Sequence, residues 1–249
     1  MSKFFQFFLL GLFFMNTNGS LGQHEPQINL LIFSKTAGFR HESIETGVKA
    51  LRELCSQNGI EVTHTEDARW FTKKRLKKFD AVLFLSTSGD VFNKKRQRAF
   101  KRFIHGGGGF IGIHAASTTE YDWPWYGQLL GAYFDGHPEA QDAVVRVTDP
   151  SHLATTHLPK KWKRFDEWYN FRWIDKSFHT LLTVDESTYT GGKHQNNHPI
   201  AWCKEFNGSK VFYTALGHTK ESYTEKQFLK HLLGGIKWVM GLENLKPDN

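Results

Sequence analysis

The chain has 249 residues, with 32 Lys or Arg and 25 Asp or Glu, so its formal net charge is +7. Aromatic residues make up 15% of the chain and charged residues 23%, a composition that excludes a disordered protein and indicates a folded domain with a sizeable core. Two basic clusters, at 73–78 and 94–98, are interpreted as solvated helix faces because no nucleic-acid-binding motif accompanies them. We therefore expect no nucleic-acid partner.

Residues 1–22 have the pattern of a secretory signal peptide. Lys3 gives a positive start, residues 4–15 form an apolar run, and Ser20-Leu21-Gly22 supplies the small residues of a cleavage site. The run is too short to span a bilayer. The sequence thus predicts an exported protein, periplasmic or extracellular, without an integral membrane part; an uncleaved N-terminal anchor is the alternative.

Cys55 and Cys203 are the two cysteines, and they are far apart in the sequence. Cys55 falls on the apolar face of a predicted helix, and Cys203 lies in an apolar predicted strand. Because cysteine is among the residues most often buried, we expect two buried thiols, although export would permit a disulfide.

The first half of the chain alternates predicted strands and helices. Apolar runs at 28–34, 81–85 and 110–113 indicate buried strands, and 61–65 is interpreted as a further short strand. Helical spacing of apolar residues predicts a helix over 44–55, and Asn93 can begin another helix that Gly106 ends. This order predicts a parallel sheet with right-handed crossovers.

The second half is less regular. A short helix is expected from the Trp123-Pro124 pair to Leu130, then a strand over 143–147 and a loop-rich segment over 149–197. Two strands, 200–205 and 211–215, are predicted to form a hairpin at Asn207-Gly208. The last helix is expected to begin with a capping box at 224–227 and to end at Gly241.

Histidines follow two of the predicted strands. His114 comes directly after the strand at 110–113, His218 follows the strand at 211–215, and a loop with Arg40 and His41 follows the first strand. Ligands of α/β sheets bind outside the carboxyl ends of strands, where an imidazole can exchange protons or bind a metal. We therefore predict that His114 and His218 line one pocket; hydrogen-bonded core histidines are the structural alternative.

Two polar-aromatic runs suggest recognition of a sugar. One includes Trp123, Tyr126 and His137, and the other includes Glu167. Aromatic rings can stack on the C–H faces of a sugar, while carboxylates and imidazoles bind its hydroxyl groups and can act as acid or base. The alternative is that these aromatic residues fill the core.

A metal site is a further possibility, although the sequence contains no HExxH motif and no cysteine pair. His114, His137, His218 and Glu167 form a set that would suit a divalent metal such as zinc if the fold brings them together. His114 and His218 are the first candidates as ligands. The spacing in the sequence leaves the cofactor open.

Four segments together resemble the ThuA-like family, which is associated with trehalose utilisation. They are SKTAGFRHESI (34–44), GGGGFIGIHAAS (106–117), DEWYNF (166–171) and VFYTALGH (211–218). The resemblance implies a ThuA-like domain over 26–243 with a class I glutamine amidotransferase-like fold, an α/β, flavodoxin-like, mostly parallel central sheet with helices on both faces. His114 stands where glutamine amidotransferases carry their nucleophilic cysteine, so glutaminase chemistry is not expected.

The resemblance also suggests which residues form the site. It carries over Gly38, Phe39, Arg40, His41, His114, Glu167 and His218, and His137 is a looser match. We interpret His114, Glu167 and His218 as the catalytic group. The substrate-binding set would be Gly38, Phe39, Arg40, His41, Trp123, Tyr126 and His137.

These observations lead to one main hypothesis, an exported enzyme that acts on a small carbohydrate such as a glycoside, a sugar or a keto-sugar. Hydrolysis, isomerisation and elimination all remain open. A non-catalytic carbohydrate-binding or scaffold domain is the first alternative, and a module whose basic helices dock an acidic partner is the second. Whether the chain forms a homodimer is also open.

Overall fold

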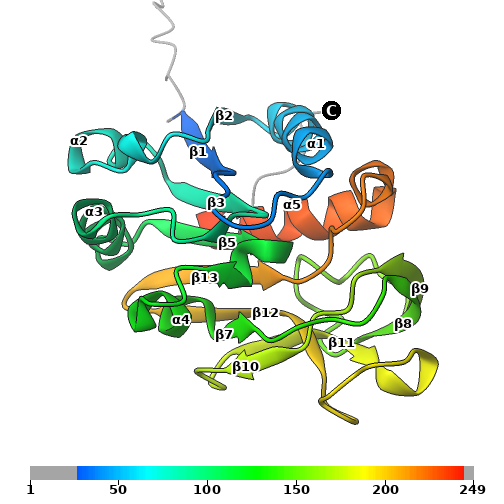
Figure 1. The fold of residues 1–249 in the computed structure, drawn as a ribbon. Helices are drawn as coiled ribbons and strands as arrows, with labels where there is room; N and C mark the ends of the chain where they lie inside the picture. The colour runs from blue at the N-terminus through cyan, green and yellow to red at the C-terminus, as the bar shows by residue number, and fades with distance from the viewer. Residues whose placement is uncertain (1–26, 244–249) are drawn as a thin grey trace, which may run out of the picture.

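The computed structural model describes residues 27–243, so the predicted signal peptide at 1–22 lies outside the described residues. Among the residues described, no helix is both long enough and apolar enough to cross a membrane. A nine-stranded mixed sheet forms the centre of the molecule (Figure 1). Its strands, in spatial order, are β2 (Ile60–Thr65), β1 (Ile28–Phe33), β3 (Ala81–Leu85), β5 (Gly109–Ile113), β13 (Ser209–Thr214), β12 (Pro199–Phe206), β11 (His179–Asp185), β8 (Gln141–Val147) and β9 (Lys161–Asp166).

Helices cover both faces of this sheet, as expected. In Figure 1, α1 and α5 lie on one side, and α2, α3 and α4 lie on the other. The helices are α1 (Ile44–Ser56), α2 (Lys73–Leu76), α3 (Lys94–His105), α4 (Pro124–Leu130) and α5 (Lys226–Met240). Two small two-stranded sheets complete the fold: β4 (Ser88–Gly89) with β6 (Thr118–Thr119), and β7 (Ala132–Phe134) with β10 (Phe171–Trp173).

The central sheet is parallel in only one of its two halves. The strands β2, β1, β3, β5 and β13 pair in parallel, whereas β13, β12, β11, β8 and β9 pair antiparallel. The expectation of a mostly parallel sheet is therefore wrong for the second half. The physical reason is that tight hairpins, such as the one at Asn207-Gly208 with positive φ angles of 51° and 82°, connect antiparallel neighbours without a crossover helix.

The segment at 149–197, expected to be loop-rich, supplies three strands: β9, β10 and β11. The hydrophobic pattern of β9 is hidden because its inward positions alternate with exposed ones and two of them are charged, Arg164 and Asp166. The capping box expected at 224–227 is also absent. Glu225 caps α5 without a side-chain bond, because its carboxylate instead accepts a hydrogen bond from Trp162 Nε1 at 2.9 Å.

Parallel pairing aligns the ends of four strands along one edge of the sheet. Leu85 of β3 pairs with Ile113 of β5, and Ile113 pairs with Thr214 of β13. Phe33, at the end of β1, pairs with Phe84 of β3. The loops after β1, β5 and β13 therefore leave the sheet side by side, and this edge gathers the predicted histidines.

The antiparallel half curls back toward that same edge. In a flat sheet β9 would lie four strand spacings, about 19 Å, from β13. Yet the carboxylate of Asp166, at the end of β9, accepts hydrogen bonds from the backbone amides of Gly217 and His218, each at 3.1 Å. The curvature thus places residue 167 beside the loop that follows β13.

The core is built from apolar side chains on both faces of the sheet. On the α3 face, Phe84 stacks on Phe100 at a centroid distance of 5.3 Å and meets Phe110 edge-on at 5.1 Å. On the α5 face, Gly235 allows close packing, since a Cβ there would come within 2.5 Å of the Phe212 ring. The prediction for the cysteines is confirmed: both are buried and free, and burial raises the pKa of each thiol to about 12.

Candidate active site

Four residues from four separate segments converge at the carboxyl edge of the parallel strands. His41 lies in the loop after β1, His114 directly follows β5, Glu167 directly follows β9, and His218 follows β13. One nitrogen or carboxylate oxygen from each residue lies within 4.8 Å of those of the other three. We call these four residues the His–Glu cluster. It brings together all three residues that sequence reasoning placed in the catalytic group, and it adds His41.

His114 is held in an unusual backbone conformation at the turn after β5. Its φ angle is +51°, in the left-handed region that a non-glycine residue rarely adopts and that costs about 1–3 kcal/mol. Nδ1 lies 2.7 Å from the carbonyl oxygen of Ala215, so Nδ1 carries the proton and donates it. In this tautomer the lone pair of Nε2 points toward the cluster, where the hydroxyl of Tyr169 lies 3.0 Å away.

Glu167 is the only carboxylate of the cluster, and it is nearly buried, with 8% of its surface exposed. Oε2 lies 3.4 Å from His114 Nε2 and 3.3 Å from His218 Nδ1. Burial alone would raise the pKa of Glu167, but its attraction to the neighbouring imidazoles of His114, His218 and His41 outweighs burial and holds that pKa well below its ordinary value. Glu167 is thus an ionised, buried carboxylate surrounded by imidazoles.

The two remaining histidines have opposite protonation tendencies. Burial lowers the pKa of His41 to about 4, against an upward pull from Glu167. The neighbouring Glu167 carboxylate raises the pKa of His218. His218 Nδ1 is nevertheless a buried nitrogen with no hydrogen-bond partner among the described residues, because its 3.3 Å contact with Glu167 lacks hydrogen-bond alignment.

Asp166 fixes the backbone of the segments that carry Glu167 and His218. Its fully buried carboxylate accepts hydrogen bonds from the backbone amides of Gly217, His218 and Glu167, the last at 2.9 Å. Arg164 Nη2, also buried, lies 2.9 Å from the same carboxylate. Sequence reasoning missed Arg164 and Tyr169 as supporting residues. For Arg164 the sequence does contain a signal: an arginine and an aspartate stand two positions apart in a strand whose alternate residues face the core.

The predicted substrate-binding loop after β1 only partly faces the cluster. The Phe39 ring, 70% exposed, meets the His41 ring edge-on at 4.9 Å, so it borders the cluster. Gly38 donates its backbone N–H to the Ser88 carbonyl at 3.2 Å, which anchors the loop. Arg40 instead pairs with Glu45 and Glu66, at 2.6 and 2.9 Å, on the surface. The side chain of Arg40 is therefore engaged outside the cluster.

His137 reaches the cluster, whereas Trp123 and Tyr126 do not. His137 is exposed, and its Nδ1 lies 3.1 Å from Glu167 Oε1, the oxygen on the far side from the three histidines. Tyr126 is fully buried and donates its hydroxyl to the Ala116 carbonyl at 2.8 Å, so the expectation that it lines a pocket is wrong. Trp123 packs on Trp125 and Tyr126 instead of the cluster, because helix α4 uses its aromatic residues to cover the sheet.

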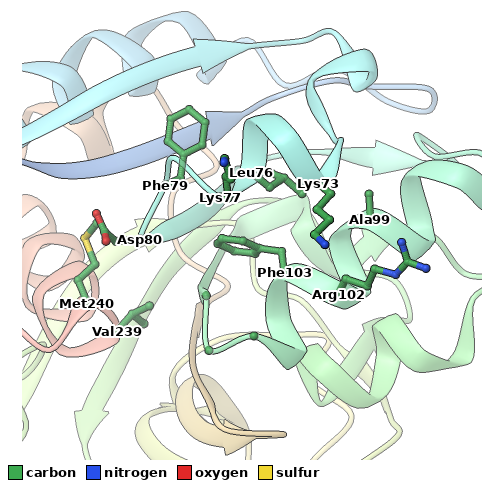
Figure 2. A pocket seen from close by; sticks show the side chains of 13 residues that line it. Lys73, Leu76, Lys77, Phe79, Asp80, Ala99, Arg102, Phe103, Val239 and Met240 are labelled. Carbon is green, nitrogen blue, oxygen red and sulfur yellow. The ribbon is translucent and has the colours of Figure 1, made fainter.

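A groove lies at the opposite edge of the sheet, before the starts of β3 and β5 (Figure 2). This basic groove has a volume of about 550 Å³. Its lining residues are Lys73, Leu76, Lys77, Phe79, Asp80, Ala99, Arg102, Phe103, Gly106, Gly107, Gly108, Val239 and Met240. The lining includes no histidine and a single carboxylate, so the groove lacks the paired acid and base that the His–Glu cluster has.

The fold and the site together define a mixed α/β protein with an imidazole–carboxylate centre at the ends of its parallel strands. Residues 29–239 match the model of the ThuA family, described as trehalose utilisation, and the chain belongs to that family. Family membership indicates a role in the utilisation of trehalose or related carbohydrates. A comparison with curated proteins found no match.

Solved structures share the fold at low sequence identity. A ThuA-like protein from Bacteroides uniformis ATCC 8492 is 24% identical, with a TM-score of 0.73 over 87% of this chain and 92% of that one. A ThuA-like protein from Parabacteroides merdae ATCC 43184 is 19% identical, with a TM-score of 0.74 over 89% and 93%. A β-galactosidase from Bacillus circulans sp. alkalophilus is 13% identical, with a TM-score of 0.56 over 89% of this chain and 32% of that one.

Proposed function

We propose that the chain is an exported enzyme that acts on a glycoside, sugar or keto-sugar through acid/base or metal-assisted chemistry at the His–Glu cluster. The observation that carries the proposal is an ionised carboxylate, Glu167, buried among three imidazoles at the carboxyl edge of the strands. A protein that only binds a sugar has little need for three buried titratable groups and a fourth that is partly buried, because their desolvation is unfavourable. The family's link to trehalose utilisation supports a carbohydrate as substrate.

The cluster offers both partners of an acid/base reaction. His114 Nε2 presents a lone pair that can accept a proton from a sugar hydroxyl, while its Nδ1–H bond to Ala215 fixes the ring. His218, whose pKa is raised by Glu167, can return a proton to a departing or developing oxygen. The exposed ring of Phe39 borders the entrance and can stack on a sugar face.

We also assign the parallel half to the flavodoxin-like class. Its strand order, β2-β1-β3-β5-β13, is the order 2-1-3-4-5 when the strands are numbered within that half. Proteins of this class bind ligands outside the carboxyl ends of the strands, near the position where the order reverses. His41 follows β1, one of the two strands at that position, which supports the cluster as the substrate site.

The test is a turnover screen of the purified protein with trehalose, other disaccharides and 3-keto-glycosides. We expect His114→Ala to abolish the turnover found for the wild type. His105→Ala is the matched control, because His105 is an exposed histidine at the end of α3, far from the carboxyl edge of the strands. Equal turnover in wild type and His114→Ala would overturn the catalytic assignment. Sugar binding without turnover, retained in His114→Ala, would support a binding domain instead.

Export has its own test. Mass spectrometry of the protein recovered from the native host's periplasm or medium should show a chain that begins directly after Gly22. Recovery of the intact chain from the cytoplasm alone would contradict this part of the proposal.

A further inference from the structure

We infer that the His–Glu cluster binds one divalent transition-metal ion, with zinc as the ion that its donors fit best. The ligands would be His41 Nε2, His114 Nε2, His218 Nδ1 and Glu167 Oε2. The inference deepens the proposed function, and what the ion would do to a substrate rests on that function. Binding of the ion can be measured without any substrate.

Two of four donor-atom distances match a tetrahedral site, and the other two lie 0.2–0.3 Å outside its range. Zinc lies about 2.0–2.2 Å from nitrogen and oxygen ligands, so neighbouring ligands of a tetrahedral ion lie about 3.3–3.6 Å apart. The nitrogen of His114 lies 3.4 Å from Glu167 Oε2, and that of His218 lies 3.3 Å from it. The two Nε2 atoms of His41 and His114 are 3.1 Å apart, and His41 Nε2 is 3.9 Å from Glu167 Oε2.

The hydrogen-bond pattern of His114 is that of a metal ligand. Histidines that bind metals usually donate their other ring N–H to a carbonyl or carboxylate, which fixes the ring and its tautomer. His114 does so with Nδ1 and the Ala215 carbonyl, which leaves a lone pair on Nε2. His218 Nδ1 is buried and has no hydrogen-bond partner in the described part of the chain. A cation in the centre would satisfy His218 Nδ1, and it would take the lone pair of His114 Nε2 in place of the Tyr169 hydroxyl, which lies 3.0 Å away.

The donor types select the class of ion. Three imidazoles and one carboxylate suit zinc and other late first-row metals, whereas magnesium and calcium prefer oxygen ligands. The four residues come from four different segments, and Asp166 fixes two of them through the amides of Glu167 and His218. The scaffold is therefore organised before any ion arrives, as a specific site requires.

The open side of the site faces solvent at His218 and Phe39. The side chain of His218 is 28% exposed, while that of His114 is fully buried. A substrate that enters there can offer adjacent carbonyl and hydroxyl oxygens, as a keto-sugar does, to an ion that polarises them when bound. His114 would then act as a ligand, and His137, which contacts Glu167 Oε1 from outside, would remain to exchange protons.

A second pair of histidines, His194 and His198, does not have the free nitrogen atoms that a metal site needs. His198 Nδ1 lies 2.7 Å from Glu186 Oε1, and its Nε2 lies 2.7 Å from the Tyr169 carbonyl. His194 Nε2 accepts the backbone N–H of Phe171 at 2.9 Å. These nitrogens are already engaged in hydrogen bonds, so this group has no set of lone pairs pointing at a common centre.

The experiment is metal titration of the purified protein after removal of metal with a chelator. We expect one zinc per chain, a rise in the melting temperature with zinc, and the visible absorption of tetrahedral cobalt when Co²⁺ replaces it. Loss of a residue that only supports a metal ligand weakens metal binding by about 10–100-fold. Zinc binding should weaken by more than this in each of the three ligand variants, His41→Ala, His114→Ala and Glu167→Gln. His137→Ala is the matched control and should keep wild-type stoichiometry.

The outcomes separate the two proposals. Failure of the metal-free wild type to bind zinc or cobalt would overturn the metal site, and sugar turnover by that metal-free protein would leave the proposed function standing. Stoichiometric zinc that is lost in the three variants, without turnover of any sugar, would support the metal site and contradict the enzyme. Zinc binding unaltered in all three variants would place the ion elsewhere and overturn the inference. The cobalt spectrum of the wild type keeps the test valid if a variant fails to fold.

Discussion

The two edges of the central sheet carry different side chains: cations line one edge, and imidazoles with a carboxylate meet at the other. The basic groove at the starts of β3 and β5 is a roomy hollow of about 550 Å³ with three cations, Lys73, Lys77 and Arg102 (Figure 2). The His–Glu cluster at the other edge is compact and mostly buried. The comparison supports the proposal that the reactive edge is the one at which titratable groups converge.

The polarity of the strands explains the difference. At the cluster edge, loops leave strands and deliver side chains inward, held by backbone bonds such as that between Ser88 and Gly38. At the groove edge, helices end: α3 ends at His105 before three glycines, and α5 ends at Met240. The single carboxylate there, Asp80, is occupied by the Asn29 backbone amide at 2.7 Å. The groove thus has cations without a partner acid to form a catalytic pair.

The largest expected effect contrasts one residue at each edge. His114→Ala should lower kcat/KM by about 10²–10⁴-fold, the range that positioned acid/base groups contribute. Lys77→Ala, in the groove, should leave kcat/KM unchanged. Steady-state kinetics on any sugar substrate found in the screen would check this. An equal loss of kcat/KM in both variants would contradict the assignment of catalysis to the cluster edge.

The next effect concerns the buried support of the cluster. Asp166→Asn removes the fully buried counter-ion of Arg164 and leaves only the partly exposed Glu225, 3.2 Å away, so it should reduce the free energy of unfolding by about 3 kcal/mol. Asp80→Asn at the groove should change it by less than about 1 kcal/mol, because Asp80 is exposed. Urea denaturation of both variants measures the difference. A small loss in Asp166→Asn would mean that Asp166 does not anchor the cluster.

A further effect, spread over several pH units, should appear as pH dependence at a buried histidine outside both edges. Burial lowers the pKa of His231 to about 3 from 6.5, while its Nδ1 lies 2.8 Å from the Ala154 carbonyl. The unfolded chain therefore takes up this proton first as the pH falls. Its contribution to stability should be lost between pH 6.5 and 3, by about 1.4 kcal/mol per pH unit.

His231→Gln should flatten this part of the curve of unfolding free energy against pH. The exposed His105→Gln serves as the control and should keep the wild-type slope. An identical slope in wild type and His231→Gln would show that His231 is not buried in its neutral form.

The smallest effect is expected in the groove itself. Arg102→Ala removes an exposed cation that forms no ion pair among the residues described. It should change the free energy of unfolding by no more than about 0.5 kcal/mol, the usual range for surface positions. Thermal denaturation would measure this. A shift of several degrees would show that the groove contributes to the fold in a way that its geometry does not explain.

Much of the parallel half could be predicted from the sequence. Its strands β1, β3 and β5 are nearly continuous apolar runs, mostly buried. Its helices carry clear apolar stripes, and α3 has a cap, the Asn93 side chain that accepts from the amides of Lys95 and Arg96. The placement of His114 and His218 at strand ends followed from the same pattern. The structure brings these two histidines together as that pattern predicted.

The antiparallel half and the complete cluster could not be predicted in this way. In β9 the inward positions include Arg164 and Asp166, a buried ion pair that breaks the alternation of apolar and polar residues. Tyr126 and a sugar-stacking aromatic residue look the same in a sequence, because only the fold shows which side of a helix meets the core. That His41 joins the cluster while its neighbour Arg40 turns to the surface is likewise decided by tertiary contacts.

The position of β13 has a consequence for the order in which the protein assembles. β13 lies between β5 and β12, yet the whole antiparallel excursion, from β8 to β12, separates it from β5 in the chain. A nascent chain must therefore finish that excursion before its last parallel strand can insert, and such long-range closure is slow. Because His218 lies four residues beyond the end of β13, the centre can be complete only once that strand has joined the sheet.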